Sequence, residues 1–134
     1  KQAHKMLGNS KQNIIDDLLK YITLEKICNL TNEIQRDRAI GYQEILYKKM
    51  IRKNKIYCCC NGQSTNKVYN VSIFINILNG NIKGNCDCPS NIYWCKHIYA
   101  LGKCFNNNPK SFKMDNRKEK LNFILKQQDK GTLQ

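Results

Sequence analysis

Residues 86–97 read CDCPSNIYWCKH, and this stretch decides how the middle of the chain folds. It holds three cysteines and one histidine in two close pairs, Cys86 with Cys88 and Cys95 with His97. Structural zinc sites take four tetrahedral ligands, and three thiolates with one imidazole are a standard set. Each pair can hold the ion from one backbone segment, and the spacer is long enough to bring the pairs together. The stretch therefore predicts one structural Zn²⁺ bound by these four side chains.

The residues on either side of this stretch predict a hairpin before it and a helix after it. Apolar residues alternate with polar ones over residues 68–78, which indicates a strand. Asn79-Gly80 follows at once and is a strong hairpin signal, because both residues tolerate positive φ. A return strand over residues 81–86 then delivers the first ligand pair. From about Cys95 the apolar residues fall on one helical face, so the order is strand, strand, zinc knuckle, helix.

Farther from the zinc ligands, the apolar spacing predicts a helical region over residues 13–50. Residues 13–30 form either one helix or two, because Thr23 has a side chain suited to cap a second one. Another helix is predicted over residues 38–50. Residues 56–60 alternate in the manner of a strand.

The chain accordingly divides into four stretches. We expect a loose polar tail at residues 1–12, the helical region at 13–50, the zinc module at 51–105, and a linker with a last helix at 106–134. The predicted fold is α+β, a small zinc-stabilised ββα module flanked by N- and C-terminal helices. A hairpin and one helix have little core of their own, so the module is expected to need its metal to fold.

The chain is strongly basic. Its 23 Lys and Arg residues outnumber 10 Asp and Glu, which gives a formal net charge of +13. Such a balance favours contact with a polyanion such as nucleic acid. Lysine supplies 19 of the 23 cations, and an AT-rich genome would also enrich lysine, so base composition stays an alternative cause. The candidate phosphate contacts are Lys48, Lys49, Arg52, Lys53 and Lys55, with Lys96 and Lys103 on the zinc helix.

Cysteine use bears on the cellular compartment. Eight cysteines in 134 residues would also fit a disulfide scaffold. Setting the three zinc thiols aside leaves five, an odd number that does not pair off completely. We therefore expect a reducing, intracellular compartment. We expect no membrane span, because no run of apolar residues is long enough, and no secretion signal.

Two further groups of residues have competing interpretations. Neighbouring residues in a strand point to opposite faces, so Cys58, Cys59 and Cys60 are poorly placed to bind one ion. We interpret Cys58 and Cys60 as small core residues, with a second metal site as the alternative. Four aromatic residues are interpreted as core, with stacking on nucleobases as the alternative. They are Tyr57, Tyr69, Tyr93 and Trp94.

The ligand order C-x-C-x(n)-C-x-H, here Cys86-Asp87-Cys88 and Cys95-Lys96-His97, resembles the SWIM-type zinc finger. The preceding residues Gly41-Tyr42, the strand at 56–60 and Val68-Tyr69-Asn70-Val71 resemble the strands that often lead into it. The resemblance covers residues 38–105. It implies a ββα module with a closed structural zinc, of a kind found in chromatin-remodelling ATPases, transposases and recombination mediators. The role that it implies is binding of DNA or protein.

Catalysis is not expected, because four protein ligands leave zinc no open position. The sequence also lacks the zinc-deaminase order, H-E-x-x-H and a phosphate-binding glycine loop. We expect a non-catalytic module that binds nucleic acid, with DNA favoured, within a larger genome-handling complex in the nucleus. The alternative is a protein–protein adaptor whose flanking helices dock a partner while zinc serves only as scaffold. Neither a membrane nor a small-molecule substrate is expected.

Overall fold

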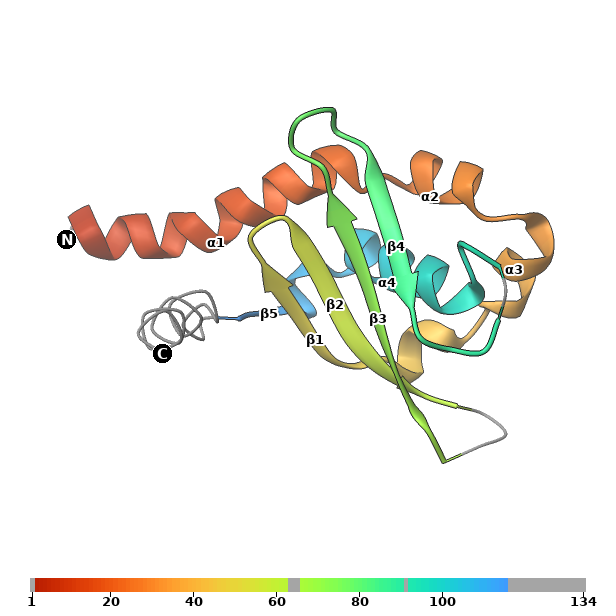
Figure 1. The fold of residues 1–134 in the computed structure, drawn as a ribbon. Coiled ribbons are helices and arrows are strands. Elements are labelled where there is room, and N and C mark those ends of the chain that lie inside the picture. The colour runs from red at the N-terminus through yellow and green to blue at the C-terminus, as the bar shows by residue number, and fades with distance from the viewer. Residues whose placement is uncertain (1, 63–65, 91, 116–134) are drawn as a thin grey trace, which may run out of the picture.

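The computed structural model describes residues 2–62, 66–90 and 92–115, which form an α+β fold (Figure 1). A five-stranded mixed sheet is combined with helices from the N-terminal part and one helix after the last long strand. The helices are α1 (Gln2–Tyr21), α2 (Leu24–Leu30), α3 (Glu33–Arg38) and α4 (Lys96–Asn107), with 3-10 turns η1 (Tyr42–Ile45) and η2 (Pro109–Ser111). The strands are β1 (Tyr47–Arg52), β2 (Lys55–Asn61), β3 (Val68–Ile75), β4 (Ile82–Cys86) and β5 (Lys113–Met114).

Within the described residues, helices cover one face of the sheet and none covers the other (Figure 1). Its strand order is β4-β3-β2-β1-β5, in which β1 to β4 run antiparallel and β5 joins β1 in parallel. Ile51, Ile56 and Ile73 lie opposite one another in the register and are fully buried. In Figure 1, α4 passes behind the sheet and no helix crosses the near face. Since side chains alternate along a strand, the isoleucines face α4 and their neighbours face the helix-free side.

The first part of the helical region contains two helices. α1 ends at Tyr21 and α2 begins at Leu24, and the Thr23 hydroxyl accepts a hydrogen bond from the Lys26 amide at 3.2 Å. This confirms Thr23 as the cap of a second helix. α1 already begins at Gln2, so most of the stretch predicted to be a loose tail is helical. Ala, Met, Leu, Lys and Gln dominate this stretch, and these are favourable helix formers.

The prediction of a helix over residues 38–50 is wrong. α3 ends at Arg38, Gly41 takes a φ of +88°, and η1 is followed by β1. The positive φ at Gly41 breaks the helical path, because only glycine adopts it freely. Beyond it, residues 50–52 pair with 55–57 of β2, so the strand partner decides the conformation of a segment whose apolar spacing looked helical.

The hairpin predicted before the zinc ligands is confirmed, with a longer turn. β3 ends at Ile75 and β4 begins at Ile82, and Gly80 has a φ of +77°. The Gly80 amide donates to the Asn76 carbonyl at 2.7 Å, which closes the turn. The strand at 56–60 is also confirmed as part of β2. The last helix expected within residues 106–134, which the sequence places at about 115–127, lies outside the described residues apart from Asp115.

One core serves the helices and the sheet together. Ile15, Leu18 and Ile27 from the first two helices belong to the same buried cluster as the sheet isoleucines and α4. α4 therefore lies on a core much larger than a hairpin and a helix would make alone. No helix in the described part of the chain combines the length and hydrophobicity that a membrane span requires.

Candidate metal centre

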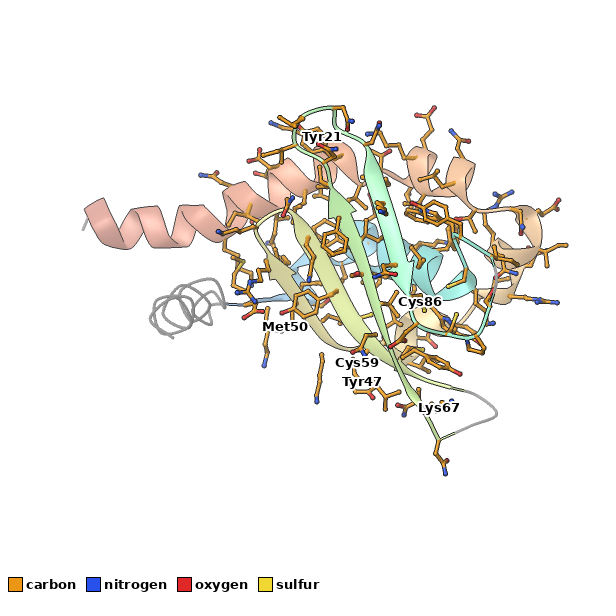
Figure 2. The ribbon with its side chains drawn as sticks, in the orientation of Figure 1. Tyr21, Tyr47, Met50, Cys59, Lys67 and Cys86 are labelled. Carbon is orange, nitrogen blue, oxygen red and sulfur yellow. The ribbon has the colours of Figure 1, made fainter. Side chains whose placement is uncertain are left out.

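The four predicted zinc ligands come from two elements that meet at one end of the sheet. Cys86 is the last residue of β4 (labelled in Figure 2) and Cys88 follows in the connecting loop. Cys95 is the N-cap of α4, and His97 lies in its first turn. The Asp87 carboxylate accepts hydrogen bonds from the backbone amide and the side-chain amide of Asn70, at 2.8 and 3.2 Å. These bonds fix the first ligand pair against β3.

The ligand atoms already have the spacing of a tetrahedral zinc site. All four lie within 4.8 Å of one another. His97 Nδ1 is 3.6 Å from Cys86 Sγ and 3.7 Å from Cys95 Sγ, and the Cys88 and Cys95 sulfurs are 3.8 Å apart. With Zn–S bonds of about 2.3 Å and Zn–N bonds of about 2.0–2.1 Å, tetrahedral edges are about 3.8 Å for S···S and about 3.6 Å for S···N. The residues therefore fit Zn²⁺, with Nδ1 as the nitrogen ligand.

The electrostatics of the three thiols also fit a cation. A hydrogen bond from Cys86, with a smaller contribution from His97, lowers the pKa of the Cys95 thiol to about 4. The same hydrogen bond and burial raise the pKa of Cys86, and burial raises the pKa of Cys88. Without a metal, a single thiolate is thus stabilised by neighbouring thiols that keep their protons. A bound dication would allow all three to ionise, since coordination deprotonates a thiol outright.

Packing shields the second ligand pair, Cys95 and His97, from water, while Cys86 and Cys88 are partly buried. The His97 ring is only 4% exposed and lies between Tyr42 of η1 and Tyr69 of β3, with ring centroids 5.4 and 5.5 Å away. Trp94 is buried directly before the second ligand pair. Four protein ligands in a tetrahedron would leave no coordination position for water, which is the arrangement of structural zinc sites. The metal would fasten β4 to the start of α4.

The other cysteines are placed as core and surface residues. Cys58 and Cys60 face the core and are buried, which confirms their interpretation as small core residues. Cys59 lies on the opposite face and is partly exposed. All eight cysteines are free thiols, and among the described residues no second group of three or more potential ligands gathers.

This alternation predicts a difference in thiol reactivity. Burial raises the pKa of Cys58 and of Cys60, so both stay protonated and shielded at neutral pH, and the thiolate is the reactive form. In the zinc-loaded protein we expect iodoacetamide to modify Cys59 at least about tenfold faster than either neighbour. Peptide mass spectrometry over a time course measures the three rates. Equal rates in the folded protein would contradict the strand register of β2.

The candidate phosphate contacts named from sequence do not form one surface. Lys55 Nζ lies on the helix-free side, 4.9 Å from the ring centroids of both Tyr57 and Phe74. Lys49 instead reaches toward the helix side, with Nζ 3.8 Å from Cys104 Sγ and 5.6 Å from the Phe112 ring. Arg52 forms a 3.2 Å ion pair with the buried Asp115 carboxylate. A group that is contiguous in sequence is thus divided between two faces.

The remaining candidate phosphate contacts lie at turns and on α4. Lys48 and Lys53 both have positive φ, 53° and 50°, at a strand irregularity and at the β1–β2 turn. Lys96 and Lys103 belong to α4, where their Nζ atoms lie 6.0 and 5.9 Å from the Tyr42 and Tyr99 rings. α4 packs on the covered face of the sheet, so these two lysines are separated from Lys55 by the sheet itself.

The aromatic residues divide in a similar way. Tyr69 and Trp94 are buried, as the core interpretation predicts, whereas Tyr57 is partly exposed and Tyr93 is 56% exposed. Phe74 was not among the aromatic residues named from sequence as candidates for stacking, and it is partly exposed on the helix-free face. Its exposure could have been predicted, because Phe74 occupies one of the alternating positions that are otherwise polar, between Ser72 and Asn76.

Comparison of the chain with protein-family models, with curated proteins and with solved structures finds no match. What is established is a Cys₃His cluster that fits a zinc site, at the junction of a hairpin and a helix.

Proposed function

We propose that this chain is a SWIM-type zinc module that binds nucleic acid, with DNA the expected form, as part of a larger nuclear, genome-handling complex. The observation that carries the proposal is the tetrahedral Cys₃His cluster in the ligand order of that finger, with a hairpin before it and a helix after it. Zinc here is structural and takes no part in a reaction. Its work is to hold β4 and α4 at a fixed angle.

The charge of the chain supports a polyanionic partner. A formal net charge of +13 attracts phosphates at long range and makes association dependent on salt. Within the sequence cluster at 48–55, Lys49 is turned toward Cys104 and Arg52 is paired with Asp115. We propose Lys48 at the start of β1, Lys53 in the β1–β2 turn and Lys55 on the helix-free side as the members that contact phosphates.

The direct test is binding of zinc-loaded protein to single-stranded DNA, duplex DNA and RNA across a salt series. Replacing Lys48, Lys53 and Lys55 by glutamine is expected to weaken binding and to flatten the plot of log K against log salt. Each lost phosphate contact lowers the slope by about 0.9 for duplex and about 0.7 for single strands. Fluorescence anisotropy measures both quantities.

The matched control replaces three lysines of α1 and α2, namely Lys11, Lys20 and Lys26, by glutamine. It removes the same charge from a different part of the surface. Equal weakening by the two triple variants would mean that net charge alone drives binding, and the proposed role of the 48–55 cluster would be lost.

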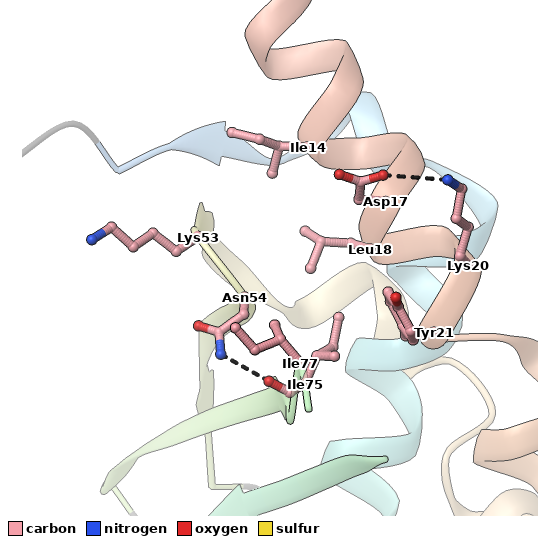
Figure 3. Close-up of a pocket in the computed structure, with 9 residues that line it drawn as sticks. All are labelled: Ile14, Asp17, Leu18, Lys20, Tyr21, Lys53, Asn54, Ile75 and Ile77. Atoms are coloured by element: carbon pink, nitrogen blue, oxygen red, sulfur yellow. Dashed lines mark hydrogen bonds and ion pairs between the residues drawn. The ribbon is translucent and has the colours of Figure 1, made fainter. Parts of the chain in front are cut away.

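The second candidate function, a protein–protein adaptor, has its own observation. A groove of about 500 Å³ lies between α1, the β1–β2 turn and the end of β3, with Ile14, Leu18, Tyr21 and Ile77 among its lining residues (Figure 3). Ile77 is 73% exposed at its rim. An apolar groove beside exposed aliphatic side chains favours a protein partner. If that function holds, neutralising the three lysines leaves partner binding intact, whereas Ile77→Ser weakens it.

A further inference from the structure

The helix-free side of the sheet forms one continuous surface, which we call the open sheet face. In one cross-strand row Lys113, Met50, Tyr57, Ser72 and Asn85 are neighbours, and in the next row Arg52, Lys55, Phe74 and Lys83 are neighbours. Met50, labelled in Figure 2, lies in the first row. All of these side chains are partly or fully exposed, while the residues between them are buried beneath the sheet.

Two aromatic rings stand at the centre of the open sheet face. Phe74 of β3 is paired with Lys55 of β2. Tyr57 lies two residues after Lys55 on the same strand, so the two rings are diagonal neighbours on the same face. The Tyr57 hydroxyl donates to the Asp115 carboxylate, which fixes the orientation of that ring. Lys55 Nζ lies 4.9 Å from both ring centroids. An aromatic pair on the side of a sheet away from its core offers π-faces on which bases can stack.

The surroundings of these rings complement a polyanion. Lysines lie at three sides, with Lys83 on β4, Lys113 on β5 and Lys48 at the start of β1. A hollow of about 620 Å³ lies between Lys48, Lys113 and Tyr57. The nearby carboxylates are already engaged, Asp87 by Asn70 and Asp115 by Arg52. The polar side chains on the same face, Ser72 and Asn85 among them, supply donors and acceptors for base edges.

The helix that follows the zinc ligands is not placed to read a duplex. Eight residues of α4 are buried, from His97 to Phe105, because the helix packs between the sheet and the N-terminal helices. A recognition helix needs a free face to enter the major groove. The open sheet face is broad and aromatic instead, a shape that suits unpaired bases, whose faces a duplex hides.

We infer that the open sheet face binds single-stranded nucleic acid, with bases stacked on Phe74 and Tyr57 and phosphates contacted by Lys55, Lys83 and Lys113. This inference rests on the proposed function and assigns it a surface and a class of strand. Lys55 exchanges its contact with the two rings for a phosphate when a base arrives. The zinc site and α4 hold the sheet from behind and do not touch the strand.

The test uses the full zinc-loaded chain and fluorescein-labelled oligothymidylate of about 12 nucleotides, a length within the range that sheet-type single-strand sites cover. Phe74→Ala is expected to weaken binding about 5- to 100-fold, because loss of one stacking platform has an effect of that size. Phe74→Leu keeps an apolar side chain of similar bulk but no π-face, and is expected to weaken binding as well. Circular dichroism and zinc content confirm that each variant is folded.

Two matched controls separate the open sheet face from the rest of the surface. Tyr93→Ala removes an exposed aromatic side chain from the zinc knuckle, and Lys103→Gln removes a lysine from α4. Both are expected to bind oligothymidylate within about twofold of the unaltered protein, while Lys83→Gln weakens binding and lowers the salt slope by about 0.7.

Two results would overturn the inference, and only one of them also rejects the proposed function. If duplex DNA binds as tightly as oligothymidylate and Phe74→Leu matches Tyr93→Ala, the strand is bound elsewhere, and the nucleic-acid function stands without this surface. If single strands, duplex and RNA all fail to bind at moderate salt, the proposed function itself is rejected. Preferential single-strand binding that depends on Phe74 and Lys83 supports both.

Discussion

Replacing His97 by alanine is expected to abolish stoichiometric zinc binding and to loosen the end of the molecule where β4 meets α4. The change removes the nitrogen ligand and leaves three sulfurs within 4.8 Å of one another, too few to close a tetrahedron. It also removes a buried ring from between Tyr42 and Tyr69. Structural zinc contributes about 10–16 kcal/mol of apparent binding free energy in small domains. Losing one of four ligands therefore costs several kcal/mol, a large share of the usual stability of a domain.

Zinc content and thermal unfolding measure the two parts of this prediction. The unaltered protein is expected to carry one equivalent of zinc, and His97→Ala much less, with a midpoint of unfolding lower by about 10 °C or more. His97→Cys is the rescue variant, because four thiolates also form a structural zinc site. Cys59→Ser, which removes a partly exposed thiol that is not a ligand, is expected to keep the metal. A His97→Ala protein that retains one equivalent of zinc and its stability would contradict the four-ligand site.

The shared core limits how far the molecule unfolds without zinc. From sequence, the zinc module was expected to consist of a hairpin and one helix with little core. In the structure, Ile15 and Leu18 of α1, Ile22 between the helices and Ile27 of α2 join the cluster that packs under the sheet. Removal of the metal with a chelator is therefore expected to release the knuckle and the first turn of α4 before the rest of the sheet. Hydrogen exchange resolves that order, because local openings exchange at lower free energy than the core.

The parts that sequence predicted are those governed by local spacing. The two ligand pairs, the Asn79-Gly80 turn and the start of α4 each depend on residues within a few positions of one another. Their geometry follows from backbone rules that hold in any context, such as the positive φ observed at Gly80. The four ligands could for that reason be named before their distances were known.

The parts that sequence missed depend on partners far along the chain. β1 pairs with β2 and with the two-residue strand β5, more than fifty residues away, and no local pattern predicts such a short strand. The division of the basic cluster has the same origin. Alternation along β1, interrupted by an irregularity between Tyr47 and Met50, sends Lys49 to one face while β2 places Lys55 on the other. Charge density in the sequence carries no information on that register.

Gly84→Ala is expected to destabilise the protein by about 1–3 kcal/mol, as overpacking of a filled core does. Gly84 lies on β4 and faces α4, where an added Cβ would stand 2.6 Å from Ile98 Cγ2 and 3.1 Å from Trp94 Cε2. Both neighbours are 1% exposed and have no room to withdraw. The φ of Gly84 is not positive, so backbone strain adds nothing and the effect is steric. The smaller entropy loss of alanine on folding offsets only about 0.4–1 kcal/mol.

Urea unfolding of the zinc-loaded protein measures this cost, and a double-mutant cycle locates it. Asn85→Ala, an exposed position on the same strand, is the matched control and is expected to change stability by less than about 0.5 kcal/mol. In a background that already carries Ile98→Ala, the Cβ of Gly84→Ala finds space, so the two changes together should destabilise less than their sum. Simple additivity would mean that α4 lies farther from β4 than the 2.6 Å contact requires. The four candidate zinc ligands at the ends of these two elements would then lack support from the packing of glycine against isoleucine and tryptophan.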